Sequence, residues 1–226
     1  MRIDIITIFP GMFCGVLGES IMKRAQNKGK VKIFIHDLRD YTLDKHHKVD
    51  DRPFGGGSGM VLQVEPIFRA LQSIKKKIKG KGRVILLCPQ GKKYVQEEAK
   101  KLTKCKNLIF ICGHYEGIDE RVRAHLVDAE ISIGDYVLTG GELAAMVVVD
   151  SLVRLIPGVL GDKNSLKFES FEGNLLEYPQ YSRPLRFKKW IVPEVLISGA
   201  HHKIEAWRKA ESLKRTKQRR PDLLKK

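Results

Sequence analysis

Apolar residues recur along the first two thirds of the chain in short unbroken runs, and this pattern limits the possible folds more than any other feature. The runs span residues 3–9, 31–36, 83–88, 107–112 and 129–133. They are apolar at almost every position rather than at every second one, as in strands covered by helices on both faces. The pattern therefore predicts buried strands in a mostly parallel sheet.

Stretches with apolar residues at helical spacing separate several of these runs, at 65–78, 92–102 and 142–156. Such alternation is typical of an α/β fold. After Ile156, Pro157-Gly158 ends the last helical stretch, and a long polar segment without periodicity follows. A segment of this kind is usually a linker or a functional lid. We predict a sheet domain over residues 1–160, a flexible linker over 161–177 and a small all-α domain over 178–226.

Positive charge is concentrated in this C-terminal region. The chain carries a net charge of +16; residues 177–226 contribute +9, from 14 Lys/Arg against 5 Asp/Glu, and the preceding 176 residues only +7. Residues 214–220 alone hold five cations. A polyanion such as RNA is the natural partner for this surface, although a solvated, solubilising tail is the simpler alternative.

The sequence shows no sign of export or membrane insertion. No apolar run approaches the roughly 20 residues that a helix needs to cross a bilayer. The N-terminal run is interrupted by Asp4 and ended by Pro10-Gly11, unlike a signal peptide. The cysteines, which lie in or beside apolar runs without any CxxC pair, are Cys14, Cys88, Cys105 and Cys112. We expect reduced core thiols in a cytoplasmic protein, and no metal site.

Three glycine-rich segments follow three of the predicted strands: Pro89-Gln90-Gly91, residues 113–117 and residues 134–141. Each alone is compatible with an ordinary turn. Because ligands bind beyond the carboxyl ends of the strands in an open parallel sheet, the three together predict a pocket. Glycine lets backbone N–H and C=O groups approach a ligand closely, which suits a heterocycle recognised through its edges.

Known nucleotide-binding motifs are absent from the sequence. It contains neither GxxxxGK[ST] nor a GxGxxG that opens a helix after a strand. The run Gly55-Gly56-Gly57-Ser58-Gly59 follows several polar residues and lacks that strand-to-helix setting. We predict that it forms a mobile loop carrying polar groups over a site.

Two charged residues near the predicted linker each allow two interpretations. Arg154 lies in the last turn of an apolar helix, where it could pair with Asp150 and interact with the helix dipole, or face a bound anion or base. Glu169 lies between Phe168 and Phe171. It is either a solvated linker carboxylate or a partly desolvated general base.

Taken together, the longer motifs resemble those of one family, the bacterial tRNA (guanine-N1)-methyltransferases of the knotted SPOUT superfamily. The resemblance covers essentially the whole chain. The segments that carry it span residues 50–60, 112–121, 132–143, 156–161, 178–184 and 219–224.

The resemblance implies a deep trefoil knot formed by the three glycine-rich loops, S-adenosylmethionine as methyl donor and a homodimer with the active site between subunits. It implies methylation of N1 of the guanosine at tRNA position 37, just 3′ to the anticodon, so that the partner is the anticodon stem-loop. The implied donor-binding residues are Pro89, Gly91, Gly113, Tyr115, Glu116, Ile133, Gly134, Tyr136, Val137, Leu138, Gly140 and Gly141. The family's essential arginine corresponds to Arg154, and some members depend on Mg²⁺.

One position departs from the family pattern. The proposed base of the family is an aspartate, and Glu169 stands at that position here. Glutamate keeps the carboxylate but adds one methylene. Two alternatives stay open at this point: a SPOUT enzyme that acts on ribosomal RNA, and an RNA-binding protein without catalytic activity.

Overall fold

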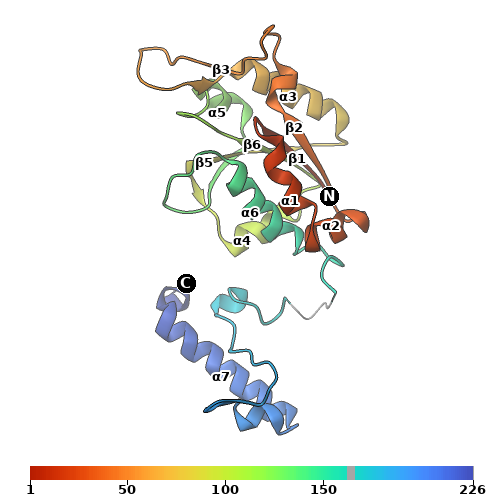
Figure 1. Cartoon of the computed structure of the whole chain (residues 1–226), viewed down its shortest axis with the longest axis vertical. Coiled ribbons are helices and arrows are strands. Elements are labelled where there is room, and N and C mark those ends of the chain that lie inside the picture. The colour runs from red at the N-terminus through yellow and green to blue at the C-terminus, as the bar shows by residue number, and fades with distance from the viewer. Residues whose placement is uncertain (162–165, 226) are drawn as a thin grey trace. The chain divides into compact units, whose positions relative to one another are not determined.

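The computed structural model describes residues 1–161 and 166–225, and the chain divides into two compact units, Met1–Gly161 and Asp162–Lys226 (Figure 1). The predicted linker, 161–177, falls across this division, and its residues 162–165 lie outside the described residues. Residues 166–177 belong to the second unit, where the Leu176 N–H donates to Thr216 Oγ1 at 2.9 Å and the Ser212 hydroxyl donates to the Leu176 carbonyl.

A five-stranded parallel sheet forms the centre of the first unit, which confirms the α/β class. Its strands are β1 (Arg2–Thr7), β2 (Lys32–Asp37), β5 (Arg83–Lys93), β6 (Asn107–Cys112) and β7 (Ala129–Ser132), in the order β2-β1-β6-β5-β7. Ile5 pairs with Phe110, and alternate residues of these strands enter two separate hydrophobic clusters. Because each face packs against its own cluster, the strands are apolar at nearly every position.

Helices cover both faces of this sheet (Figure 1). On one face, α3 (Val64–Lys77) and α5 (Glu120–Leu126) bury Ile67 and Val122 in one cluster. On the other, α2 (Ser20–Asn27), α4 (Gln96–Leu102) and α6 (Glu142–Val153) contribute to the second cluster. The shorter elements of this unit are α1 (Cys14–Leu17), β3 (Asp50–Asp51), β4 (Val61–Leu62) and the 3-10 turns Pro10–Phe13 and Leu38–Tyr41.

The prediction of a helix over 92–102 was wrong at its start. After a register shift β5 resumes pairing with β7, with Lys92 opposite Ile131 and Lys93 opposite Ser132, so α4 begins only at Gln96. Tertiary pairing here outweighs the helical spacing. The last helix of the unit also ends earlier than predicted, at Val153 instead of Ile156.

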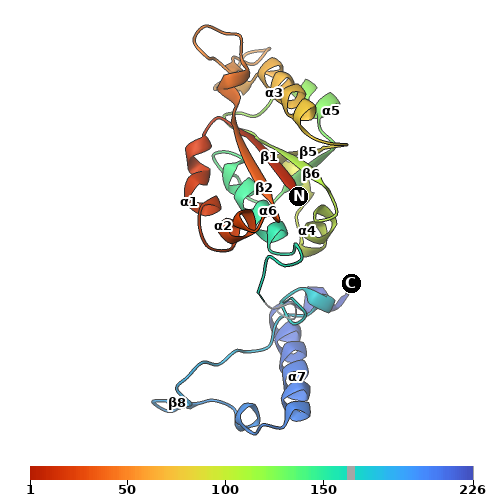
Figure 2. The same ribbon diagram turned by 90° about the vertical axis from the view of Figure 1, so that its right-hand side faces the viewer.

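The second unit is mainly helical, although the prediction of an all-α tail missed a short hairpin. Strands β8 (Arg186–Phe187) and β9 (Trp190–Ile191) pair antiparallel, and Figure 2 shows β8 at the tip of a loop away from α7. The main helix of this unit is α7 (His201–Arg219). The 3-10 turns Glu172–Asn174 and Glu194–Ile197 precede it in the chain, and the 3-10 turn Pro221–Lys225 follows it. Within the described residues, no helix is both long enough and apolar enough to cross a bilayer.

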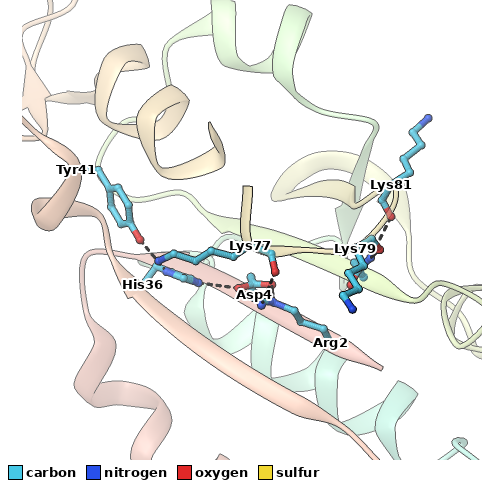
Figure 3. A network of polar contacts seen from close by, with 8 residues as sticks. Arg2, Asp4, His36, Tyr41, Lys77, Lys79 and Lys81 are labelled. Carbon is cyan, nitrogen blue, oxygen red and sulfur yellow. Dashed lines mark hydrogen bonds and ion pairs between the residues drawn. The ribbon is translucent and has the colours of Figure 1, made fainter. Parts of the chain in front are cut away.

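A buried carboxylate joins several elements inside the sheet domain (Figure 3). Asp4 in β1 is fully buried and accepts hydrogen bonds from Arg2 Nε and Nη2, each at 2.8 Å. His36 Nε2 lies 2.8 Å from Asp4 Oδ1, and His36 Nδ1 lies 2.9 Å from the Tyr41 hydroxyl. Arg2 also donates to the Lys77 carbonyl at 3.3 Å, so the network joins β1, β2 and the end of α3.

Replacing Asp4 by Asn is expected to lower the free energy of unfolding by about 3 kcal/mol, because Arg2 and His36 lose a buried acceptor. Burial raises the pKa of Asp4, but the hydrogen bonds from Arg2 and His36 outweigh it, so the pKa lies below its ordinary value of 3.8. The stabilisation is therefore present above that value and is lost as the pH falls through the lowered pKa.

Urea unfolding at neutral pH and at pH values below 3.8 measures this contribution. The exposed Asp40→Asn is the matched control, with an expected change within about 0.5 kcal/mol. Equal midpoints for Asp4→Asn and the wild type at neutral pH would show that the network adds no stability.

Candidate functional site

The three glycine-rich loops meet at the carboxyl edge of the sheet and line one pocket. Every predicted donor-binding residue lines it except Gly91. The chain forms this edge because β6, β5 and β7 are neighbouring parallel strands: residues 89–91 lie at the register shift within β5, and the other two segments follow β6 and β7 beside it. The sequence pattern therefore located the pocket correctly.

Gly91 has a different place. It lies in the part of β5 that packs against β7, and a Cβ at Gly91 would overlap the backbone of Glu130 and Ile131. Only glycine allows this approach of two chain segments. Gly91 thus allows β5 to pack against β7 and does not itself line the pocket.

Two of the glycines bring the second and third loops together. Gly141 N–H donates to the Gly113 carbonyl at 2.8 Å, and His114 pairs with Gly140 in an isolated bridge. A Cβ at Gly141 would lie 2.8 Å from Cys112 Cα, which is closer than real Cβ atoms come. The wall of the pocket is therefore backbone at this point, as expected for a site that recognises a ligand through main-chain groups.

Aromatic side chains stand at the mouth of the pocket. Tyr115 and Tyr136 are about half exposed, and Val137 is 83% exposed. Tyr115 adopts a left-handed conformation with φ of 58°, which is strained for a residue with a side chain. Exposed apolar groups and backbone strain at one place are features of a binding surface.

The segment after the glycine run 55–59 is fixed beside the pocket. Glu116 N–H donates to the Met60 carbonyl and Leu62 N–H to the Gly117 carbonyl, both at 3.0 Å. A Cβ at Gly59 would overlap the Glu116 side chain. One end of the predicted mobile loop is thus anchored to the second loop of the site, while Phe54 at the other end is fully exposed.

A half-buried polar cluster borders the first loop. Arg123 of α5 forms an ion pair with Glu130, and the Cys88 thiol donates to Glu130 Oε2 at 3.1 Å. Burial, together with the adjacent carboxylate, raises the pKa of Cys88, so its thiol is protonated at neutral pH. All four cysteines are free, but the prediction that they are core thiols was wrong for Cys14, which is exposed.

Arg154 and Glu169 lie in different units. Arg154 is the C-cap of α6, and its N–H donates to the Asp150 carbonyl at 3.3 Å. Glu169 lies in the second unit, where it lines a hollow together with Phe168, Tyr178 and Arg208. The Arg208 guanidinium stacks 4.8 Å from the centre of the Tyr178 ring.

The basic segment 214–220 forms the last turns of α7 and the residue after it. Two of its cations have carboxylate partners: Lys214 lies 3.7 Å from Glu211, and Arg220 forms a two-point ion pair with Asp222. Trp207, on the same helix, is partly buried against Tyr181, with ring centres 6.5 Å apart.

Sequence reasoning missed His114, Glu142 and Thr7. Glu142 and Thr7 are buried and joined by a 2.7 Å hydrogen bond, and His114 lines the pocket. Their residue types alone give no signal, because the contacts depend on how β1, β6 and α6 meet. Among residues 1–161 and 166–225, no group of three or more His, Cys, Asp or Glu side chains is placed to hold a metal ion.

Comparison with known proteins extends this description to the whole chain. The family model described as tRNA (Guanine-1)-methyltransferase TrmD matches residues 1–226. Among similar proteins are the tRNA (guanine-N(1)-)-methyltransferases of Anoxybacillus flavithermus, 58% identical, and of Halalkalibacterium halodurans, 56% identical. Each alignment spans 224 residues, which is 99% of this chain and 91% of the relative. The chain therefore belongs to the tRNA (guanine-1)-methyltransferase TrmD family.

Proposed function

We propose that this chain transfers a methyl group from S-adenosylmethionine to N1 of the guanosine at position 37 of tRNA, giving 1-methylguanosine. The reaction class, methylation of guanine in tRNA at N1, is that of the family to which the chain belongs. The observation that supports the donor site is the backbone-lined pocket at the carboxyl edge of β5, β6 and β7.

The residues at this pocket suit the methyl donor. Main-chain groups of Leu138 would hydrogen-bond the edge of an adenine, next to the backbone wall that Gly113 and Gly141 form. Apolar Ile133 and Leu138 would cover its faces. When bound there, S-adenosylmethionine supplies an electrophilic methyl group on a positively charged sulfur.

Two charged side chains are proposed to act on the guanine: one removes its N1 proton, and the other stabilises the negative charge that develops. Guanine N1 carries a proton that must leave during methylation, and Glu169 is the proposed general base. As the proton leaves, negative charge develops toward O6, and the Arg154 guanidinium is the proposed donor that stabilises it. Glu169 shares its hollow with Arg208, Tyr178 and Phe168, which offer stacking surfaces for an RNA base.

The tail is the proposed docking surface for the anticodon stem-loop. Helix α7 carries Lys203, Lys209, Lys217 and Arg219 on exposed positions, and phosphate contacts by such cations release counterions. Because tRNA is made and used in the cytoplasm, we place the enzyme there.

The dimer and the trefoil knot are also proposals that rest on the family. In the proposed dimer, the tail of one subunit serves the donor pocket of its partner. The close approaches at Gly91 and Gly141 are compatible with a knot, because threaded chain segments must pass each other without side chains between them.

A mixing experiment tests whether the site is shared between subunits. Gly140→Val would disrupt the wall of the donor pocket, because its Cβ would overlap Glu142 and His114, and Glu169→Gln would remove the base, so each variant alone is expected to be inactive. Coexpression of the two is expected to restore about a quarter of the wild-type rate, since half of random dimers are mixed and each has one intact site. No restoration would mean that both residues act within one subunit.

Mg²⁺ dependence is not supported by this chain's own residues. The described part of the chain holds no carboxylate cluster suited to Mg²⁺, which prefers several oxygen ligands. We therefore derive no step through a metal ion.

Methyl transfer from tritiated S-adenosylmethionine to purified tRNA and, in a parallel reaction, to ribosomal RNA, each followed by nucleoside analysis, tests the proposed function. The expected labelled product is 1-methylguanosine. A different nucleoside, or label in ribosomal RNA only, would contradict it, and RNA binding without any transfer would indicate a binding protein.

A further inference from the structure

His114 directly follows Gly113, the first residue of the pocket's central loop, and its imidazole is held between two aromatic rings. The Phe9 and Tyr115 rings meet it edge to face at 4.9 and 4.8 Å between ring centres. The residue lines the pocket, yet its Nδ1 is shielded from solvent and has no hydrogen-bond partner within the described part of the chain. Buried polar atoms are rarely left unpaired, so this nitrogen needs an explanation.

Glu142, at the start of α6, places a buried carboxylate near that nitrogen. Glu142 is 2% exposed, and its Oε1 accepts a hydrogen bond from the Thr7 hydroxyl at 2.7 Å. The Thr7 oxygen in turn accepts from the Phe9 N–H at 2.9 Å. Oε1 of Glu142 is thus held by Thr7 of β1, and Oε2 takes no part in this hydrogen bond.

Glu142 Oε2 and His114 Nδ1 occupy the same small space beside Gly140. A Cβ at Gly140 would lie 2.6 Å from Nδ1 and closer still to Oε2. The two atoms are therefore near neighbours, and glycine at 140 leaves room for them. The His114–Gly140 bridge and the hydrogen bond from Gly141 to Gly113 hold the surrounding backbone in place.

We propose that Thr7, Glu142 and His114 form a hydrogen-bonded chain that keeps the imidazole proton on Nδ1 and presents Nε2 to the methyl donor as an acceptor. A carboxylate beside one ring nitrogen fixes the tautomer and leaves the other nitrogen free to bind a ligand. Because Nδ1 is shielded while His114 lines the pocket, the pocket side of the ring carries Nε2. The matching ligand group is an O–H or N–H, such as a ribose hydroxyl or the amino-acid ammonium group of S-adenosylmethionine. This inference rests on the proposed function.

Calorimetric titration of the full-length protein with S-adenosylmethionine tests the ligand side. His114→Phe keeps an aromatic ring between Phe9 and Tyr115 but removes both nitrogens, and is expected to weaken donor binding about five- to tenfold, the loss of one hydrogen bond. His114→Gln, whose amide reaches the position of Nε2, is expected to recover binding better than His114→Asn. The exposed His125→Phe on α5 is the matched control and is expected to bind as the wild type does.

Wild-type affinity in a folded His114→Phe or His114→Asn would overturn the inference while leaving the proposed function intact. Absence of donor binding by the wild-type protein would overturn the proposed function, and the inference with it. Unfolding midpoints of the variants accompany the titrations, so that weaker binding by a folded His114→Asn than by His114→Gln counts as support even if His114→Phe unfolds.

The role of Glu142 as a positioning residue has a spectroscopic test that packing alone would not affect. Nitrogen-15 NMR of the imidazole in the ligand-free protein is expected to show His114 with its proton on Nδ1. In Glu142→Gln, we expect a mixture of tautomers and weaker donor binding. A proton on Nε2 in the wild type, or the same tautomer in Glu142→Gln, would overturn the proposed chain.

Discussion

Replacing Glu169 by Gln is expected to lower the rate of methyl transfer by a factor of about 10²–10⁴, the usual contribution of a general base. Glutamine has almost the same shape but cannot accept the N1 proton of guanine. Single-turnover measurement with saturating tRNA and donor isolates this step from product release. The affinity for tRNA should change little, since the side chain keeps its size.

Two variants serve as controls for Glu169→Gln. Glu172→Gln alters a second carboxylate that lines the same hollow and is expected to leave the rate within about twofold of the wild type. Glu169→Asp keeps the carboxylate but moves it by one methylene, and shows how much the extra length matters. An unchanged single-turnover rate in Glu169→Gln would mean that another group removes the proton.

Replacing Arg154 by Ala is expected to lower the same rate by about 10²–10³, the usual cost of removing one donor that stabilises developing negative charge. Arg154 follows the last residue of α6 and does not line the donor pocket. The affinity for S-adenosylmethionine should therefore stay within about twofold of the wild-type value. Separate measurement of donor affinity and transfer rate distinguishes the two effects.

Arg154→Lys is the informative companion to Arg154→Ala. Lysine keeps the charge but not the planar, two-point geometry of the guanidinium, so only a small part of the rate is expected to return. Full activity in Arg154→Ala would remove the residue from the mechanism. A large loss of donor binding would instead mean that Arg154 supports the pocket.

The parallel sheet could be predicted from the sequence, because strands buried on both faces are apolar at nearly every position. Ile5, Phe110 and Ile111 are examples. The extension of β5 through Lys93 could not be predicted, because its residues are polar and its pairing with β7 depends on a distant segment. The hydrogen-bond network of Asp4 could not be predicted either, because it needs His36 from another strand as well as Arg2 from the same strand. Contacts between distant segments leave no local pattern.

The candidate site, too, could be predicted from the sequence only in part. Glycine-rich segments near the ends of three predicted strands located the pocket, because backbone approach demands glycine whatever the ligand is. The role of Gly91 in packing against Ile131, and that of Gly140 in making room for His114 and Glu142, depend on the neighbours of each glycine in space. Arg154 and Glu169 were identified through resemblance to a family, since their local patterns favour ordinary surface roles.

Two transcripts of one tRNA that differ only at position 37 test directly whether the chain methylates N1 of the guanosine at this position. With tritiated S-adenosylmethionine, we expect the transcript with guanosine at position 37 to gain label as 1-methylguanosine. Its adenosine-37 counterpart is expected to gain none. Equal labelling of both transcripts, or a labelled nucleoside other than 1-methylguanosine, would contradict it.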